Sequence, residues 1–437
     1  MKKIKIFTRS LGCPKNLVDT ENILGGFGSL YEPAEDISKC HVVLINTCAF
    51  IRPAVEESLD VIFSAHDRIK DLENKPLLVV TGCLVSRYGA GLGSDIPETD
   101  IFTGITEQGD LPGLILNKLG KDARKIVSVR KISTPKSYAY LKISEGCNNK
   151  CSFCTIPSIR GRLRSRPMDH ILKEAASLLD SGVRELIIVA QDSTAYGRDI
   201  GYKSGLAGLV KEFVTLAGLK RLRVMYLYPS GLNRRLLEII AKAGGPFVPY
   251  FDVPFQHSHP DILKKMGRPF RDDPNSIIQR IRDVFPGAVI RTTLITGYPG
   301  ETSEHFGHLL DFVKRVRFQH LGVFPFYSEE GTRAAGFTGQ VPRDIRTKRA
   351  QRIMDVQRKI SRSFLKNYDD ELLDILVDAP HTEWPGLFKG RAWFQAPEID
   401  GMTYVSGPDV RPGVLVRARV QETGDYDLTT LQENLMG

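Results

Sequence analysis

The sequence predicts an α/β protein in three parts: an N-terminal parallel α/β domain, a central parallel α/β layer or open barrel, and a small C-terminal β-barrel. Apolar, strand-like runs alternate with helix-like segments up to residue 368, which is typical of parallel α/β folds. The polar stretch Lys131–Ser137 contains a proline and separates two such regions. Beyond residue 369 short strand-like pieces alternate with Gly/Pro turns, the pattern of a small β-barrel. We therefore expect domains at residues 1–130, 131–368 and 369–437.

Three cysteines of the first domain share one local pattern. Cys13, Cys48 and Cys83 are each 35 residues apart, and each ends an apolar run that a helix-like segment follows. Strand, helix and a period of this length predict βα units. The carboxyl ends of parallel strands meet at one sheet edge, where open α/β sheets bind ligands. The spacing thus predicts a shared metal site, whereas Cys40, outside the pattern, is interpreted as a small buried hydrophobe.

The central domain contains six strand-like runs, fewer than the eight of a closed (β/α) barrel. They begin at Tyr138, Glu185, Arg223, Tyr250, Val289 and Leu321. A long basic helix is predicted from Pro342 to about Lys366. Its expected apolar face consists of Ile345, Ile353, Val356, Ile360 and Phe364.

A second cysteine set, Cys147, Cys151 and Cys154, lies in EGCNNKCSFC just after the first of these strands. Closely spaced thiolates are typical iron–sulfur ligands. Zinc is the alternative, but a zinc ribbon requires a second Cys or His pair at a set distance, and none follows here. Three ligands instead of four would leave one iron open to a small molecule.

Composition excludes several classes of protein. The 437-residue chain contains no apolar run near 18 residues, which excludes a membrane-spanning protein. Its start lacks the apolar core of a signal peptide, so we expect no export signal. Seven cysteines, an odd number without an export signal, indicate reduced thiols in the cytoplasm. The net charge of +9 is a weak indication of an anionic partner.

The second cysteine set has the pattern C-x-x-x-C-x-aromatic-C, in which Phe153 is the aromatic residue. This pattern resembles the signature of the radical S-adenosylmethionine (SAM) superfamily. The resemblance implies an open six-stranded partial barrel and a 4Fe-4S cluster whose open iron binds SAM. The upstream three-cysteine domain is similar to that of the methylthiotransferases, which carry a second 4Fe-4S cluster there and a C-terminal TRAM domain. We therefore expect no catalytic residue beyond the cluster ligands.

The resemblance also implies SAM contacts. Gly297, Gly300 and Glu301 in LITGYPGET resemble the glycine-rich motif near the adenine, although a simple turn is the alternative. Gln191 ends the second strand where many members carry a GGE-type motif, so the amino-group contact is left open. His257 has counterparts in the methylthiotransferases, with local hydrogen bonding as the alternative.

Four alternating arginines follow the second cysteine set. Arg160, Arg162, Arg164 and Arg166 would form a phosphate site on one face of an extended segment if the partner were a nucleic acid. A solvated edge, or internal pairing with carboxylates, is the alternative.

Charge favours a protein substrate. Residues 370–437 contain twelve acids and five bases, a net charge of −7, which leaves +16 for the rest. Such a barrel suits a basic protein surface, unless it is merely a solubilising tail. SLGCPKNLVDTE and APEIDG are similar to the RimO-type branch of the methylthiotransferases.

That branch implies methylthiolation of the β-carbon of an aspartate in small-subunit ribosomal protein twelve, free or in the subunit. It also implies that SAM first methylates a sulfur on the auxiliary cluster. The radical from the second cluster then removes a substrate hydrogen. An external electron donor and sulfur source are expected, with a monomeric enzyme and no membrane. The alternatives are tRNA adenosine methylthiolation and a non-catalytic iron–sulfur or zinc protein that binds ribosomes.

Overall fold

The computed structural model describes residues 3–121, 129–268 and 273–433. The chain forms two compact units, which are treated separately. The first comprises residues 1–133, 145–148 and 154–162, and the second comprises residues 134–144, 149–153 and 163–437. Over the described ranges, no helix combines the length and apolarity needed to cross a bilayer.

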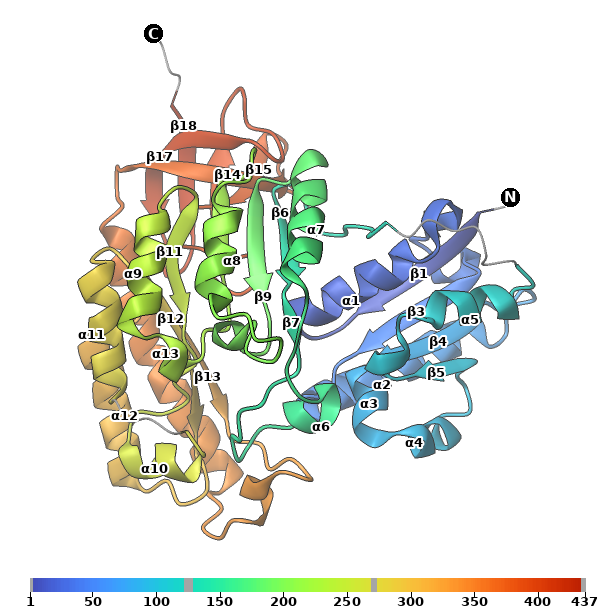
Figure 1. Cartoon of the computed structure of the whole chain (residues 1–437), viewed down its shortest axis with the longest axis horizontal. Helices are drawn as coiled ribbons and strands as arrows, with labels where there is room; N and C mark the ends of the chain where they lie inside the picture. Colours follow the sequence, from blue (N-terminus) through green and yellow to red (C-terminus); the bar gives the residue numbers. More distant parts are fainter. Residues whose placement is uncertain (1–2, 122–128, 269–272, 434–437) are drawn as a thin grey trace. The chain divides into compact units, whose positions relative to one another are not determined.

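The first unit is built on a parallel five-stranded sheet in the order β2-β1-β3-β4-β5 (Figure 1). Its strands are β1 (Ile4–Ser10), β2 (Tyr31–Pro33), β3 (Val42–Thr47), β4 (Leu77–Gly82) and β5 (Ile101–Thr103). Its helices are α1 (Pro14–Gly25), α2 (Arg52–Ile69), α3 (Cys83–Tyr88), α4 (Ala90–Asp95), α5 (Leu111–Lys118) and α6 (Ile156–Arg160). Every residue of β3 is buried, because separate apolar clusters cover the two sheet faces.

The three predicted βα units are confirmed as β1–α1, β3–α2 and β4–α3. The three-residue strands β2 and β5 were not expected, since runs this short have no readable alternation. Cys40 is buried in an apolar cluster, and its Sγ donates to the Ile37 carbonyl (3.2 Å), as predicted for a small hydrophobe.

The second unit contains an open, fully parallel six-stranded sheet in the order β13-β12-β11-β10-β9-β6. Its strands are β6 (Tyr138–Lys142), β9 (Glu185–Val189), β10 (Arg221–Val224), β11 (Phe247–Asp252), β12 (Val289–Thr296) and β13 (His320–Pro325). Helices connect them along the outer face (Figure 1): α7 (Met168–Asp180), α8 (Gly205–Phe213), α9 (Arg234–Ala243), α11 (Pro274–Val284) and α12 (Ser303–Val316). The short helix α10 (Pro260–Lys265) follows β11 and lies beyond the carboxyl ends of the strands (Figure 1). All six predicted strands and the open partial barrel are confirmed. The short strands β7 (Ser144–Glu145) and β8 (Arg164–Ser165) flank the second cysteine set along the chain.

The predicted long helix is confirmed as α13 (Arg343–Lys366). Its buried face differs in part from the prediction, because Ile345 is exposed near the helix start, whereas Gln357 is buried. Gln357 is tolerated inside because its amide donates to the Phe318 carbonyl (2.8 Å).

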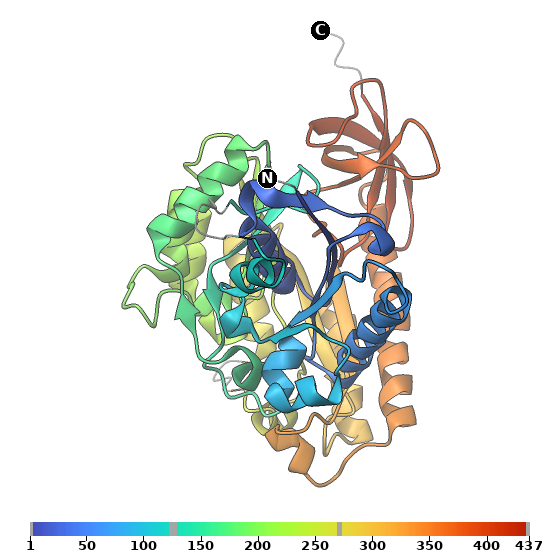
Figure 2. The same ribbon diagram turned by 90° about the vertical axis from the view of Figure 1, so that its right-hand side faces the viewer.

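The C-terminal part is a closed five-stranded β-barrel, as predicted, at the end of α13 (Figure 2). Its strands are β14 (Leu372–Pro380), β15 (Leu387–Arg391), β16 (Thr403–Ser406), β17 (Leu415–Thr423) and β18 (Leu428–Gln432). β15 and β18 were not predicted.

Buried charges join this β-barrel to the first residues of the six-stranded sheet. Glu185 opens β9 and pairs with Arg223 (2.8 Å) and Arg391 (2.6 Å). Arg391 also pairs with Asp378 (2.8 Å) of β14. These arginines lower the pKa of Glu185 to about 2, although burial alone would raise it.

A second junction centres on Asp400, in the APEIDG string. Its buried carboxylate accepts from Tyr250 Oη (2.7 Å) and Arg291 Nη1 (2.6 Å), and lies 3.3 Å from His320 Nδ1. Segment 391–400 therefore packs near the amino ends of strands of the six-stranded sheet, and the carboxyl ends of these strands lie on the opposite side. Asp378 and Asp400, two of the twelve acids of the C-terminal part, are consequently directed inward.

Candidate functional site

The first three cysteines follow β1, β3 and β4 at the carboxyl edge of their sheet. Cys13 is partly buried, and Cys48 and Cys83 are buried. The backbone before Cys13 touches Cys48, because a Cβ added to Gly12 would lie 2.7 Å from Cys48 Sγ. Negative charge on Cys13 and Cys83 raises the pKa of Cys48, and negative charge on Cys13 raises the pKa of Cys83. The structure thus brings these three side chains together, as the spacing predicts.

Asn16 connects the strand ends that carry these thiols. Its Nδ2 donates to the carbonyls of Leu11 (2.9 Å) and Thr47 (2.8 Å), the latter directly before Cys48. Its Oδ1 lies 3.6 Å from Cys83 Sγ. Sequence reasoning missed Asn16. Its one signal is a short polar residue three positions after Cys13, inside a helix that packs on the core.

Arg160, at the end of α6, lies beside the thiols. It is 3% exposed and pairs with Asp19 (3.1 Å) and Glu145 (2.8 Å). Its Nη2 also donates to Asn16 Oδ1 and lies 3.6 Å from Cys83 Sγ. A buried guanidinium in this position offsets negative charge that develops on the sulfurs.

The thiols differ in acidity. Burial raises the pKa of Cys48 to about 12, and burial also raises the pKa of Cys83, against the opposing effect of Arg160. Burial opposes ionisation of Cys13 too, but Lys15, Arg160 and backbone N–H groups outweigh it and lower the pKa of that thiol. The Cys13 thiol is therefore more acidic than the Cys48 and Cys83 thiols, and a metal that binds all three would bind their thiolate forms.

This donor set fits an iron–sulfur cluster. Three sulfur ligands stand at one edge in an apolar setting, with a buried cation to balance the negative charge of thiolates and sulfides. A catalytic zinc with thiolate and imidazole ligands fits less well, because the described residues around these thiols include no histidine contact.

The second cysteine set lies on the loop between β7 and α6. Cys147 is held in the first unit, where its N–H donates to the Gly161 carbonyl (3.1 Å). Cys151 belongs to the second unit, and its Sγ lies 3.9 Å from Tyr228 Oη. The Arg268 guanidinium lies 4.6 Å from the centre of the Tyr228 ring. Cys154 is partly buried.

Ser152 and Phe153 belong to the second unit and make contacts within it. Ser152 donates through its N–H to the Met266 carbonyl (2.9 Å), and its Oγ lies 2.7 Å from Tyr298 Oη. Phe153 packs on the apolar cluster that contains Met266 and Tyr298. Ser152 and Phe153 are thereby held, within the second unit, beside segments that follow β11 and β12.

The predicted glycine-rich segment follows β12, and its acidic residue is directed inward. Glu301 Oε1 accepts from the Gly297 N–H (2.9 Å) and pairs with Arg349 (2.5 Å), while Oε2 lies 3.3 Å from His257 Nε2. Both side chains of the His257–Glu301 pair are fully buried. The carboxylate therefore fixes the turn that includes Gly297 and Gly300.

His257 makes the local contacts that were one of the two expectations. Its Nδ1 accepts from the His259 N–H (2.9 Å), which assigns the proton to Nε2, facing Glu301. Burial lowers the pKa of His257, although Glu301 opposes the shift. Gln191 follows β9, and the next residue, Asp192, accepts from Asn149 Nδ2 (2.8 Å) on the cysteine loop.

The four alternating arginines do not share one free face. Arg160 is buried in ion pairs and Arg166 pairs with Glu174 (2.6 Å), whereas Arg162 and Arg164 are exposed. Arg160 and Arg166 therefore pair internally with carboxylates, which was the alternative to a phosphate site.

Comparison with known proteins assigns the three parts. Residues 5–104 match the uncharacterized protein family UPF0004, residues 141–313 match the radical SAM superfamily and residues 371–431 match the TRAM domain. A solved structure with a similar fold is the radical SAM methyltransferase TsrM from Kitasatospora setae. It has a TM-score of 0.54 at 16% identity and covers 74% of this chain and 73% of its own. The fold and cysteine loop thus define a radical SAM enzyme with a C-terminal TRAM domain.

Curated relatives match over nearly the full length. The ribosomal protein uS12 methylthiotransferase RimO of Oleidesulfovibrio alaskensis is 52% identical over 98% of this chain and 100% of its own length. RimO of Lawsonia intracellularis is 49% identical over 97% of both chains. The chain belongs to the RimO family of radical SAM methylthiotransferases. This family implies SAM and 4Fe-4S clusters as cofactors, and the relatives do not favour the tRNA-modifying or non-catalytic alternatives.

Proposed function

We propose that this enzyme methylthiolates the β-carbon of an aspartate in ribosomal protein uS12. One observation carries the proposal: three thiols meet at one sheet edge, in a chain whose full-length relatives are uS12 methylthiotransferases. A radical SAM enzyme that only cleaves SAM needs one cysteine triplet. The second triplet indicates that a further group, here sulfur, is bound and transferred.

The cofactors divide between the two triplets. Cys147, Cys151 and Cys154 would hold the cluster that binds SAM, and Cys13, Cys48 and Cys83 would hold the auxiliary cluster. When bound, these groups supply the electron that cleaves SAM to a deoxyadenosyl radical and the sulfur that is transferred. The protein's own contribution is to orient ligands, balance charge through Arg160 and exclude water from the thiols.

Residues at the carboxyl ends of the barrel strands would form the SAM pocket. We assign Phe153, Gln191, Gly297, Gly300 and Glu301 to this pocket. The geometry distinguishes their roles: Glu301 would act through the Gly297 turn as a positioning residue, because its carboxylate already engages Arg349 and His257. Gly297 and Gly300 would bring backbone close to the ligand.

The C-terminal barrel would bind the protein substrate. Most of its acids remain outside the buried junction, and ribosomal proteins are basic, so the charges are complementary. An external electron donor and sulfur source, a monomeric state and a cytoplasmic location complete the proposal, together with the three domains at residues 1–130, 131–368 and 369–437.

Mass spectrometry tests the proposal directly. Ribosomal proteins and tRNA from cells with and without this gene would be compared for the added methylthio mass. We expect the mass on one aspartate of uS12 and on no tRNA adenosine. Loss of the modification from tRNA instead, with uS12 unchanged, would contradict the proposal.

A further inference from the structure

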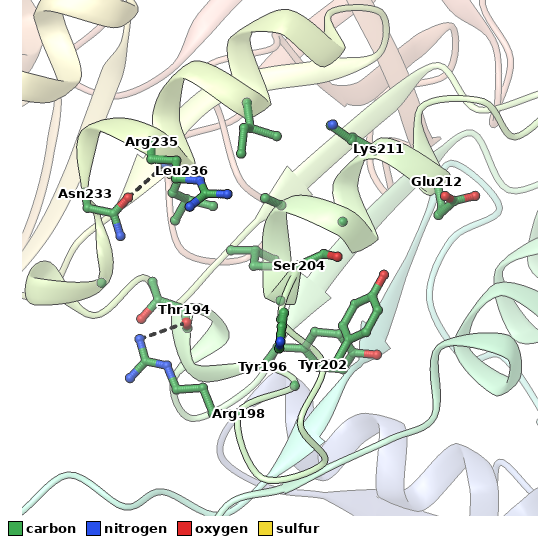
Figure 3. Close-up of a pocket in the computed structure, with 18 of the residues that line it drawn as sticks. Thr194, Tyr196, Arg198, Tyr202, Ser204, Lys211, Glu212, Asn233, Arg235 and Leu236 are labelled. Atoms are coloured by element: carbon green, nitrogen blue, oxygen red, sulfur yellow. Dashed lines mark hydrogen bonds between the residues drawn. The ribbon is translucent and has the colours of Figure 1, made fainter.

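An open pocket of about 840 Å³ lies between α8, α9 and the loop after the short helix η4 (Ser193–Ala195) (Figure 3). It belongs entirely to the second unit. None of the cysteines or proposed SAM contacts lines it. It is therefore distinct from the site described above.

The lining of the pocket is strongly basic. It contains the exposed side chains of Arg198, Lys203, Lys211 and Arg235, against one acid, Glu212. In the view of Figure 3, Arg198 and Arg235 lie on one side and Lys211 and Glu212 on the other.

These cations are not paired internally. Over the described parts of the chain, none of the four makes an ion pair, and Arg198 donates only to the Thr194 carbonyl (3.3 Å). The adjacent Arg234, outside the pocket lining, instead pairs with Glu238 (2.8 Å). Positive charge is thus concentrated where it can meet an anion.

Two helices also begin at this pocket. The first turns of α8 and α9 both contribute lining residues, and α8 has no side-chain cap from Ser204. Asn233 caps α9 by accepting from the Leu236 N–H (2.9 Å). Helix N-termini carry partial positive charge and free N–H donors, which add to the attraction of the four side chains.

The pocket suits phosphate groups rather than bases. Tyr196 is 1% exposed and meets Tyr202 edge to face, and Tyr202 Oη donates to Met168 Sδ (3.0 Å). Tyr196 is therefore too buried to stack on a base, and Tyr202 is only partly exposed, so the described lining is dominated by cations and not by aromatic faces. Exposed cations around an open hollow are typical of sequence-independent contact with a nucleic-acid backbone.

We propose that this pocket binds the phosphodiester backbone of ribosomal RNA and docks the enzyme on the assembled small subunit. The inference rests on the proposed function, because uS12 is a ribosomal protein and an assembled ribosomal subunit contains RNA. It gives part of the net positive charge outside residues 370–437 a role in contacting RNA, in addition to the contact of the acidic C-terminal barrel with the protein substrate.

Binding would be measured with a fluorescent 20-nucleotide RNA hairpin and the reconstituted full-length enzyme. We compare R198Q/R235Q with R343Q/R352Q, a control that removes two exposed arginines of α13. The pocket variant should bind about tenfold more weakly, with a salt slope smaller by about 2, and the control should bind as the parent does. Equal weakening in both variants would overturn the proposal. Binding of inorganic pyrophosphate by the enzyme, with no binding of the RNA hairpin, would also overturn it and would indicate a small-phosphate site.

Activity distinguishes this inference from the proposed function. On salt-washed small subunits R198Q/R235Q should modify uS12 about tenfold more slowly than the parent, while on isolated uS12 both should act equally. Equal rates on both substrates would overturn the docking role alone. Absence of methylthiolated uS12 with either substrate, while RNA binding persists, would instead contradict the proposed function.

Discussion

The Glu185 carboxylate lies 2.6 Å from the Arg391 guanidinium, and both side chains are almost fully excluded from solvent. Glu185 opens β9 of the partial barrel, and Arg391 ends β15 of the TRAM barrel, 206 residues later. The same carboxylate holds Arg223. The TRAM barrel is thus joined to the catalytic barrel through a buried ion network, which defines how the two domains are held together.

Replacing Glu185 with Gln should be severely destabilising. Two arginines would remain buried without their shared counter-charge, which costs about 3–5 kcal/mol. Urea unfolding would be followed by Trp393 fluorescence in a W384F background, since the chain has only two tryptophans and the Trp393 carbonyl accepts from Arg223. The control is Glu238→Gln, which removes an exposed pair with Arg234 and should cost less than about 1 kcal/mol. Equal costs would contradict the role of the network.

His257 should make stability depend on pH. Burial lowers its pKa below the ordinary value of about 6.5, so the unfolded chain binds a proton more readily than the folded one. Its contribution is therefore fully present above about pH 6.5 and is lost as pH falls toward the folded pKa. The urea midpoint of the parent should fall more steeply between about pH 7.5 and 5.5 than that of His257→Gln. Parallel pH profiles would show that His257 is not responsible.

Local sequence patterns predicted the longer strands and the edge of the sheet at which the first three cysteines lie. Alternating apolar runs located all six strands of the barrel, and the equal spacing of Cys13, Cys48 and Cys83 predicted their meeting, because parallel strands end at one edge. The three-residue strands β2 and β5 were not predicted, because pairing with the longer strands β1 and β4 stabilises them and the local sequence pattern does not. Ile345 fits the helical period but stays 37% exposed, whereas the neighbouring Arg346 contacts Thr296 and Phe326, so the helical period alone does not identify the buried residues in the first turn of α13.

Contacts between distant residues could not be read in this way. Arg160 lies 141 residues from Asp19, and its sequence context is a row of four equivalent arginines. Only the fold selects which of them is buried beside the thiols. In the same way, the acids of the C-terminal part look alike in sequence, yet Asp378 and Asp400 form buried junctions while others face solvent.

Gly12 should be required for the auxiliary cluster. Its φ of 84° is unfavourable for other residues, and a Cβ there would lie 2.7 Å from Cys48 Sγ. Gly12→Ala should therefore displace Cys48 and lower the iron content of reconstituted enzyme from about eight toward about four per chain. Gly89→Ala is the matched control, because Gly89 has a φ of 73° but no atom within 4 Å of an added Cβ. It should cost only the backbone strain and keep full iron content. Full iron in Gly12→Ala would contradict the prediction.

Arg160 should be needed both for stability and for the auxiliary cluster. Arg160→Gln removes the buried ion pairs with Asp19 and Glu145, at a cost of about 3–5 kcal/mol, and removes the cation beside Cys83. Arg160→Lys retains the charge but not the several N–H donors of the planar guanidinium, so its losses of stability and of iron content should be intermediate. The neighbouring Arg162→Gln, at an exposed position, is the control. Iron and sulfide analysis with urea unfolding measures both effects. If Arg160→Gln matched Arg162→Gln in both measurements, the charge-balancing role would be wrong.

The two cysteine triplets should separate the two parts of the reaction. Cys151→Ala should abolish formation of 5′-deoxyadenosine from SAM, because the cluster that binds SAM loses a ligand. Cys48→Ala should still form 5′-deoxyadenosine but yield no methylthiolated uS12, since only the auxiliary site is damaged. Cys40→Ala is the control: Cys40 is buried outside both triplets, with its Sγ bonded to the Ile37 carbonyl, and its removal should preserve both products. Methylthiolated uS12 from the Cys48 variant would show that sulfur reaches the substrate without the first triplet.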